Sequence, residues 1–167
     1  MAIPGDRPRT RILLVCMGNI CRSPMAHGML RQGLRELRWQ ERVAIDSAGT
    51  HGYHAGSAPD ERAQLATARR GIDISDLRAR AVAVEDFACH DLILAMDELN
   101  LGNLRAAAAA EHRRKIHLFM EYATGDAGRS VPDPYYGGPI GFERVLDMLE
   151  EATEGLLLRL RAELEEP

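Results

Sequence analysis

The chain has 167 residues, a formal net charge of −4 and a hydrophobic content of 46%. These values fit one soluble domain built around a single hydrophobic core. The charge is mildly acidic and no cluster rich in Lys and Arg stands out, which argues against a nucleic-acid partner. No apolar run is long enough to span a bilayer, so we expect no membrane insertion.

The cysteines and the first residues indicate a cellular compartment. Cys16, Cys21 and Cys89 are few and odd in number, which does not suit a secreted disulfide scaffold. Residues 1–10 are polar, contain two prolines and lack the apolar segment of a signal peptide. We therefore expect a cytoplasmic protein with a flexible tail at 1–10 and a single domain at 11–165. The oligomeric state is left open, with a monomer as the default expectation.

The first half of the chain alternates apolar runs with helical patterns. The continuous apolar run at 11–17 is typical of a strand that is buried on both faces. Ser23 and Pro24 then favour the start of a helix, as N-cap and first helical residue, and apolar residues recur at helical spacing to about Arg38. The next expected elements are a strand at 42–49, a loop at 50–59 and a helix at 60–70 that Gly71 terminates.

The second half continues this alternation. The expected elements are a short helix at 84–90, a strand at 91–97, a mostly helical segment at 99–113, a strand at 115–120, a loop at 121–141 and an amphipathic helix at 142–163. A loop of this length in a compact domain is more often functional than idle. The whole pattern predicts an α/β fold, a doubly wound, four-stranded parallel sheet with helices on both faces.

The segment LLVCMGNICRSPMAHG carries the candidate site. Cys16 ends the first apolar run, and Arg22 follows six positions later. Ligands of doubly wound sheets bind where a strand leads into a helix, and the backbone N–H groups there form an anion cradle. Gly18 and Asn19 tolerate the backbone angles that such a loop needs, and Arg22 offers a planar fork for two phosphate oxygens. The spacing predicts a phosphate held between sulfur and guanidinium.

The same arrangement suggests covalent chemistry on the phosphate. Positive surroundings favour the thiolate form of a cysteine, and Ser23 can donate a hydrogen bond to the sulfur of Cys16. The leaving oxygen needs a proton, which Asp133 can supply from its place between two prolines in the long loop. Tyr135 and Tyr136 follow directly and can line an entrance for an aromatic ring.

Structural alternatives exist for each of these residues. A cysteine at a strand end often packs in the core, and an Asp-Pro pair is a common turn. Cys16 and Cys21 could also be metal ligands, but no second Cys/His pair with zinc spacing accompanies them. The combination of Gly, Asn, Ser-Pro and Arg at a strand-to-helix junction favours phosphate chemistry, and we expect neither a metal nor a cofactor.

Two motifs, VCMGNICRSP at 15–24 and DPYYG at 133–137, resemble those of the low-molecular-weight protein-tyrosine phosphatases. Further segments, among them DSAGTHGYHAGSAPDERA and EDFACHDLILAMDELNL, follow in family order, so that the resemblance covers nearly the whole chain. It implies a flavodoxin-like fold and a two-step reaction without a metal. In that reaction Cys16 forms a phosphocysteine while Asp133 protonates the tyrosine oxygen, and Asp133 then activates the water that hydrolyses the intermediate.

The resemblance also implies roles for the neighbouring residues. Arg22 and the loop amides hold the phosphoryl oxygens, and Cys21 can form a reversible disulfide with the nucleophile. The residues assigned to phosphate binding or its support are Met17, Gly18, Asn19, Ile20, Cys21 and Ser23, and those at the substrate rim are Tyr53, Tyr135 and Tyr136. Phosphotyrosine proteins and small aryl phosphates are the implied substrates, and phosphate and other oxyanions the inhibitors. His27 stands where the family often has Glu, and we interpret it as a harmless difference at the surface or behind the site.

Three alternatives remain. An arsenate reductase of the same fold relays electrons through two further cysteines, whereas this chain has only Cys89, which we interpret as a buried core residue. Protein-arginine phosphatases look to have a small polar residue in place of Ile20 and Asp-Pro-Phe in place of Asp-Pro-Tyr. A catalytically idle phosphotyrosine-binding or redox-sensing module based on Cys16 and Cys21 would not need the complete set of nucleophile, arginine, serine and acid.

Overall fold

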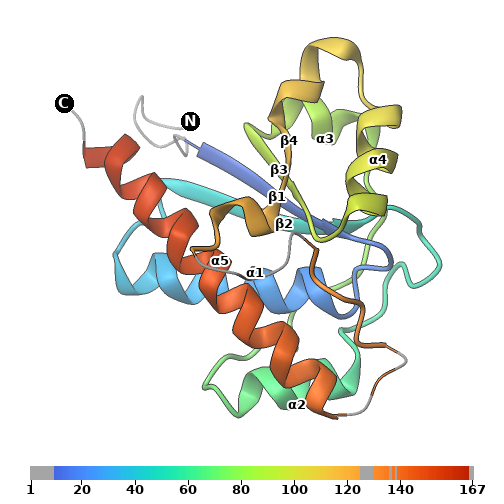
Figure 1. Cartoon of the computed structure of the whole chain (residues 1–167), viewed down its shortest axis with the longest axis vertical. Helices are drawn as coiled ribbons and strands as arrows, with labels where there is room; N and C mark the ends of the chain where they lie inside the picture. Colours follow the sequence, from blue (N-terminus) through green and yellow to red (C-terminus); the bar gives the residue numbers. More distant parts are fainter. Residues whose placement is uncertain (1–9, 125–129, 136, 138, 166–167) are drawn as a thin grey trace, which may run out of the picture.

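The computed structural model describes residues 10–124, 130–135, 137 and 139–165 (Figure 1). Within this part of the chain, four parallel strands form one sheet in the order β2-β1-β3-β4. The strands are β1 (Thr10–Cys16), β2 (Val43–Gly49), β3 (Leu92–Ala95) and β4 (Ile116–Leu118). Of the predicted tail, only Thr10 lies inside the described residues, and it begins β1. The predicted α/β fold with a parallel four-stranded sheet is confirmed.

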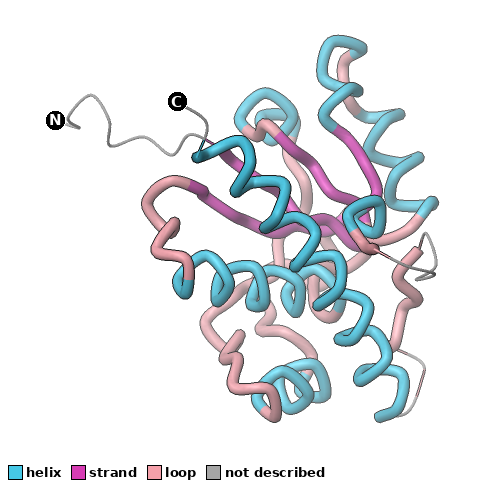
Figure 2. The backbone as a smooth tube through the Cα atoms, turned by 60° about the vertical axis from the view of Figure 1, so that its left-hand side comes forward, coloured by secondary structure: helices cyan, strands magenta, loops and turns pink. Residues whose placement is uncertain are grey.

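Helices cover both faces of this sheet (Figures 1 and 2). One face carries α1 (Arg22–Glu36), α2 (Glu61–Ala68) and α5 (Pro139–Glu165), and the other carries α3 (Val84–Cys89) and α4 (Glu98–Ala107). Two short 3₁₀ helices flank β4, η1 at Ala110–Lys115 and η2 at Phe119–Tyr122. No helix among the described residues is long and apolar enough to cross a membrane.

The central strand β1 divides the core into two parts. Its alternate side chains Ile12 and Leu14 pack with α1, α2 and α5, whereas Leu13 and Val15 pack with α3 and α4. All four are fully buried, which is why this strand reads as a continuous apolar run rather than an alternating one. The strand therefore delivers Cys16 to the carboxyl edge of the sheet, where its register partner in β2 is Gly49.

Several element boundaries differ from the prediction. Ser23 is not an N-cap, because α1 begins one residue earlier and the Ser23 hydroxyl is bonded within the site described below. The segment expected to be helical over 99–113 splits into α4 and η1, and the strand expected at 115–120 keeps only its first half before η2. Helix α5 begins inside the expected loop, at Pro139. Gly71, with φ +77°, follows α2 as predicted.

The prediction that Cys89 is a core residue is wrong. Helix α3 buries Asp86 and Phe87 against the sheet, and Cys89 lies two positions beyond Phe87, on the side that faces solvent. Its thiol is free and the residue is exposed.

Helix α5 packs on the backbone of η2 at Gly155. A Cβ atom built at this glycine would overlap the carbonyl oxygen of Tyr122, which is backbone and cannot turn aside. Gly102, at the middle of α4, has nothing within 4 Å of the same position. Both glycines lie inside helices, and only Gly155 is closely packed. Gly102 is therefore the matched control for a substitution at Gly155.

We expect Gly155→Ala to destabilise the fold by about 2 kcal/mol or more, because overpacking forces backbone shifts. Gly102→Ala should instead leave stability unchanged or raise it by up to ~1 kcal/mol, since alanine is the better helix former. Urea unfolding of both variants beside the wild type measures the difference. Equal stability of Gly155→Ala and wild type would contradict the close packing of α5 on η2.

Candidate functional site

The loop from β1 to α1, residues 16–22, forms a cradle at the carboxyl edge of the sheet. A pocket of about 300 Å³ opens over it, which we call the cradle pocket. Its lining residues are Cys16, Met17, Gly18, Ile20, Cys21, Arg22, His51, Tyr53, His54, Asp133 and Tyr135. The structure thus brings the nucleophile, arginine and acid candidates to one pocket from positions more than a hundred residues apart. Tyr136 lies outside the described residues.

Two groups face the sulfur of Cys16 from beneath the pocket. The backbone N–H of Asn19 donates to Sγ at 3.3 Å, and the Oγ of Ser23 lies 3.1 Å from Sγ. The side-chain amide of Asn19 donates to the same Ser23 oxygen at 2.7 Å. Because this oxygen already accepts from Asn19, its own proton is free to point at the sulfur. The arrangement orients the sulfur and can stabilise negative charge when it acts as a leaving group.

Asn19 also ties the cradle to the rest of the fold. Its φ of 58° lies in the left-handed region, which asparagine tolerates better than most residues. Its Oδ1 accepts from the backbone N–H of Arg80 at 3.1 Å. The guanidinium of Arg80 is in turn held by Asp46 and Asp86, each at 2.9 Å. The sequence analysis missed Arg80, and no local pattern marks it.

Arg22 is a buried cation, with 2% of its side chain exposed. One terminal nitrogen donates to Asp97 at 2.6 Å and to the carbonyl of Val131 at 3.0 Å, and the other lies 3.6 Å from Asp133. Asp97 also accepts from the backbone N–H of Asn100 at 2.7 Å, so it caps α4 as well. The sequence analysis missed Asp97, although an acid directly after an apolar strand was a usable signal.

Asp133 lies at the mouth of the cradle pocket. Its Oδ1 accepts from the backbone N–H of Tyr135 at 3.0 Å, and 37% of its side chain is exposed. The backbone N–H of Val131 donates to the Met96 carbonyl at 2.7 Å, which fixes this segment against the end of β3. The carboxyl group is therefore held near the guanidinium and still reachable by a group that enters the pocket.

Aromatic and imidazole rings form the rim. Tyr53 is 87% exposed, and its ring centroid is 4.2 Å from that of His51. His54 and Tyr135 are 6.5 Å apart by the same measure. The two histidines were not predicted as site residues, and both belong to the loop expected at 50–59. The rim offers flat surfaces on which an aryl group can lie.

Cys21 lies in the cradle but in a different electrostatic setting from a nucleophile. Burial, followed by the charges of Asp60, Cys16 and Asp133, raises the pKa of the Cys21 thiol far above its ordinary value. Cys21 therefore stays protonated at neutral pH. Both cradle cysteines are free in this structure, so the reversible disulfide between them stays a prediction.

His27 lies behind the site, and its predicted alternative as a surface residue is wrong. The residue is 7% exposed, and its Nδ1 forms a hydrogen bond of 3.0 Å with the Ser47 hydroxyl. Burial, with a smaller contribution from Arg31, lowers the pKa of His27 from 6.5 to about 4. The ring is therefore neutral in the folded protein near neutral pH.

This pKa predicts a pH-dependent stability. Between pH 6.5 and about 4, His27 is protonated in the unfolded chain and neutral in the folded chain. The free energy of unfolding therefore falls as the pH falls through this range. The full effect is roughly 3 kcal/mol, at about 1.4 kcal/mol per pKa unit. Wild type should lose more stability than His27→Gln when urea unfolding is compared at pH 7 and pH 5. Since the carboxylates are common to both proteins, equal losses would contradict a neutral buried His27.

Comparisons with known proteins agree on one family. A family model described as low molecular weight phosphotyrosine protein phosphatase matches residues 11–166. A putative low molecular weight protein-tyrosine-phosphatase of Synechocystis is 43% identical over 155 residues, which cover 92% of this chain and 98% of the relative. The human low molecular weight phosphotyrosine protein phosphatase is 41% identical over 145 residues, which cover 84% of this chain and 89% of the relative. A crystal structure of a protein tyrosine phosphatase from Entamoeba histolytica, with Hepes in its active site, is 38% identical and superposes with a TM-score of 0.88, over 92% of this chain and 97% of that one.

Proposed function

This chain belongs to the low molecular weight phosphotyrosine protein phosphatase family, and we propose that Cys16, Arg22 and Asp133 carry out its reaction. The reaction is the metal-free hydrolysis of phosphotyrosine and small aryl phosphates through a phosphocysteine. The observation that carries the assignment is that sulfur, guanidinium and carboxyl line one pocket, with the guanidinium 3.6 Å from the carboxyl.

In the first step the phosphoryl group lies in the cradle. The Cys16 thiolate attacks phosphorus, the bond from phosphorus to the tyrosine oxygen breaks, and Asp133 in its acid form gives that oxygen a proton. Arg22 and the N–H groups of the loop hold the phosphoryl oxygens, on which the transition-state charge is spread. The burial of Arg22 supports this role, because its fixed position requires no rearrangement at the moment of reaction.

In the second step water replaces the phenol. The Asp133 carboxylate takes a proton from the water that attacks phosphorus, and the bond between phosphorus and sulfur breaks. The sulfur leaves as a thiolate, which the Ser23 hydroxyl and the Asn19 backbone N–H stabilise from 3.1 and 3.3 Å. Inorganic phosphate is released, and the resting thiolate is restored.

The pocket favours an aryl phosphate over phosphoarginine. Ile20 gives the cradle pocket an apolar wall, and the rings of Tyr53 and Tyr135 lie at its mouth. A phosphoarginine carries a polar guanidino group at the place where these side chains offer apolar surface. This supports phosphotyrosine as the substrate and leaves protein-arginine phosphatase as the second candidate.

The remaining assignments concern the surroundings of the enzyme. Phosphotyrosine-bearing proteins are the substrates, and free phosphate and other oxyanions inhibit by occupying the cradle. One chain supplies every group of the proposed site, so that catalysis requires no second subunit, and residues 11–165 form the catalytic domain. Reducing cytoplasm keeps Cys16 available as a nucleophile, and a reversible disulfide with Cys21 would protect it during oxidation.

Steady-state hydrolysis of para-nitrophenyl phosphate, a phosphotyrosine peptide and a phosphoarginine peptide, all with a chelator present, tests the function. Cys16→Ser should abolish turnover of every substrate. Asp133→Ala should lower kcat by roughly 10²- to 10⁴-fold on the peptide. The loss should be smaller on the nitrophenyl ester, because nitrophenolate leaves without a proton.

The three substrates separate the alternatives. Faster turnover of phosphoarginine than of phosphotyrosine would select the arginine phosphatase. Tight binding of the phosphotyrosine peptide with no turnover of any substrate would select the idle binding module. Full activity of Cys16→Ser would contradict the assignment of Cys16 as the nucleophile.

Asp97 is expected to act by positioning Arg22. Asp97→Asn removes the charge from the 2.6 Å contact and should lower kcat/KM for aryl phosphates about tenfold, the worth of one charge-assisted hydrogen bond. Phosphate, measured as a competitive inhibitor, should bind correspondingly more weakly. Glu98→Gln is the matched control, because this neighbouring acid is exposed and should have no effect. Equal effects of the two changes would point to general electrostatics rather than to the Arg22 contact.

A further inference from the structure

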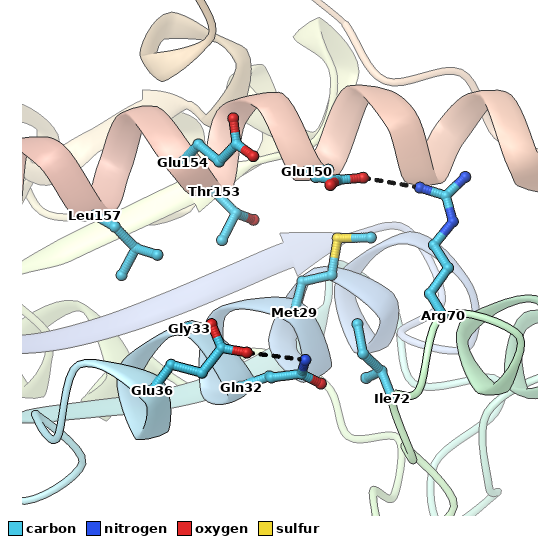
Figure 3. Close-up of a pocket in the computed structure, with 10 residues that line it drawn as sticks. All are labelled: Met29, Gln32, Gly33, Glu36, Arg70, Ile72, Glu150, Thr153, Glu154 and Leu157. Carbon is cyan, nitrogen blue, oxygen red and sulfur yellow. Dashed lines mark hydrogen bonds and ion pairs between the residues drawn. The ribbon is translucent and has the colours of Figure 1, made fainter.

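A second pocket lies between α1 and α5, and we call it the helix pocket (Figure 3). Its volume is about 270 Å³, and its lining residues are Met29, Gln32, Gly33, Glu36, Arg70, Ile72, Glu150, Thr153, Glu154 and Leu157. Among the residues that the structure describes, none lines both this pocket and the cradle pocket. The helix pocket is therefore separate from the catalytic site.

Thr153 marks an unfilled polar position in the helix pocket. The residue is 5% exposed, and its hydroxyl is buried without a hydrogen-bond partner in the described part of the chain. In Figure 3 its side chain points from α5 toward α1, into the gap between the helices. A buried hydroxyl without a hydrogen-bond partner destabilises the fold, so a ligand that bonds to it gains affinity.

The charges around the helix pocket favour a cation. Glu36, Glu150 and Glu154 line it, and Arg70 is its one lining cation among the described residues. Arg70 is already shared by three carboxylates of α5, Glu143 at 2.9 Å, Asp147 at 2.8 Å and Glu150 at 3.0 Å. Glu36 accepts a hydrogen bond of 3.2 Å from Gln32, and no ion pair holds it among the residues that the structure describes (Figure 3). The three glutamates that line the pocket therefore outnumber Arg70, and only Glu150 among them is paired with it.

An apolar surface continues from one end of the helix pocket. A neighbouring hollow of about 290 Å³ is lined by Leu37, Glu154, Leu157, Leu158 and Arg161, and so shares Glu154 and Leu157 with it. Leu158 is 64% exposed. Three of the five residues that line this hollow are leucines, which offer an alkyl chain an apolar surface next to the helix pocket.

From these observations we propose that the helix pocket binds a small amphiphilic cation, an alkylguanidinium. The planar guanidinium presents several donors, which can bond to the Glu36 carboxylate and the Thr153 hydroxyl together. An ammonium ion lacks this fixed fork and pairs less well with two separate acceptors. The alkyl chain lies over Leu157 and Leu158, where it removes apolar surface from water.

Isothermal titration calorimetry with three probes tests the ligand class. Hexylguanidinium should bind at least about tenfold more tightly than hexylurea, which has the same shape without charge, since bonds to charged groups are worth about 1.5–3 kcal/mol. It should also bind more tightly than ethylguanidinium, whose chain does not reach the leucines. Equal affinities for hexylguanidinium and hexylurea would overturn the proposal, as would no heat of binding with any probe.

Variants locate the site. Glu36→Gln should weaken hexylguanidinium about tenfold and hexylurea clearly less, because the urea N–H groups lose a neutral hydrogen bond and the guanidinium loses a charge-assisted one. Thr153→Val keeps the side-chain shape, removes the hydroxyl and should weaken both probes. Glu151→Gln is the control, with the same charge change on α5 outside the lining of the helix pocket. Weakening by Glu151→Gln equal to that by Glu36→Gln would show unspecific attraction and would contradict the site. Phosphate hydrolysis plays no part in these measurements, so they are independent of the proposed function.

Discussion

The buried guanidinium of Arg22 is the constraint on which the candidate site depends. A cation with 2% exposure is stable only if the fold supplies partners, and these partners come from distant segments. Asp97 stands at the start of α4, and Val131 and Asp133 belong to the segment before α5. The contacts of this one guanidinium therefore hold three segments together at the carboxyl edge of the sheet: the loop from β1 to α1, the start of α4 and the segment before α5. Its second terminal nitrogen lies 3.6 Å from the carboxyl group of Asp133.

The sulfur is fixed by a different set of bonds. Ser23 and Asn19 contact it directly, Asn19 is held by the backbone of Arg80, and Arg80 is held by Asp46 and Asp86. A continuous series of hydrogen bonds and ion pairs thus joins the cradle to β2 and α3. This series fixes the left-handed turn at Asn19, which an isolated loop would have little reason to adopt. Rigid placement of the donors allows a static loop to stabilise transition-state charge.

The sequence predicted what is local. Continuous apolar runs located the four strands, which lie in the middle of the fold, and helical periodicity located the α-helices of the described residues, each of which buries one face. The prediction failed where a side chain bonds to a residue that is distant in the sequence. Ser23 has the pattern of an N-cap, but its hydroxyl serves Cys16 and Asn19. Asp97 and Arg80 were missed because their partners Arg22 and Asn19 are 75 and 61 positions away. Cys89 was misplaced because a six-residue helix has too few apolar positions to define its buried side.

We propose that Cys16 carries the phosphoryl group between the two steps. Rapid mixing of Asp133→Ala with para-nitrophenyl phosphate should release a burst of nitrophenol, since the first step needs the acid less than the second needs the base. Quenching into denaturant and recording the ³¹P NMR spectrum should then show a thiophosphate ester, and the same experiment on Cys16→Ser should show none. Two results would contradict this role of Cys16. One is a burst without a thiophosphate signal, and the other is a protein-bound phosphoryl group that is still found in Cys16→Ser.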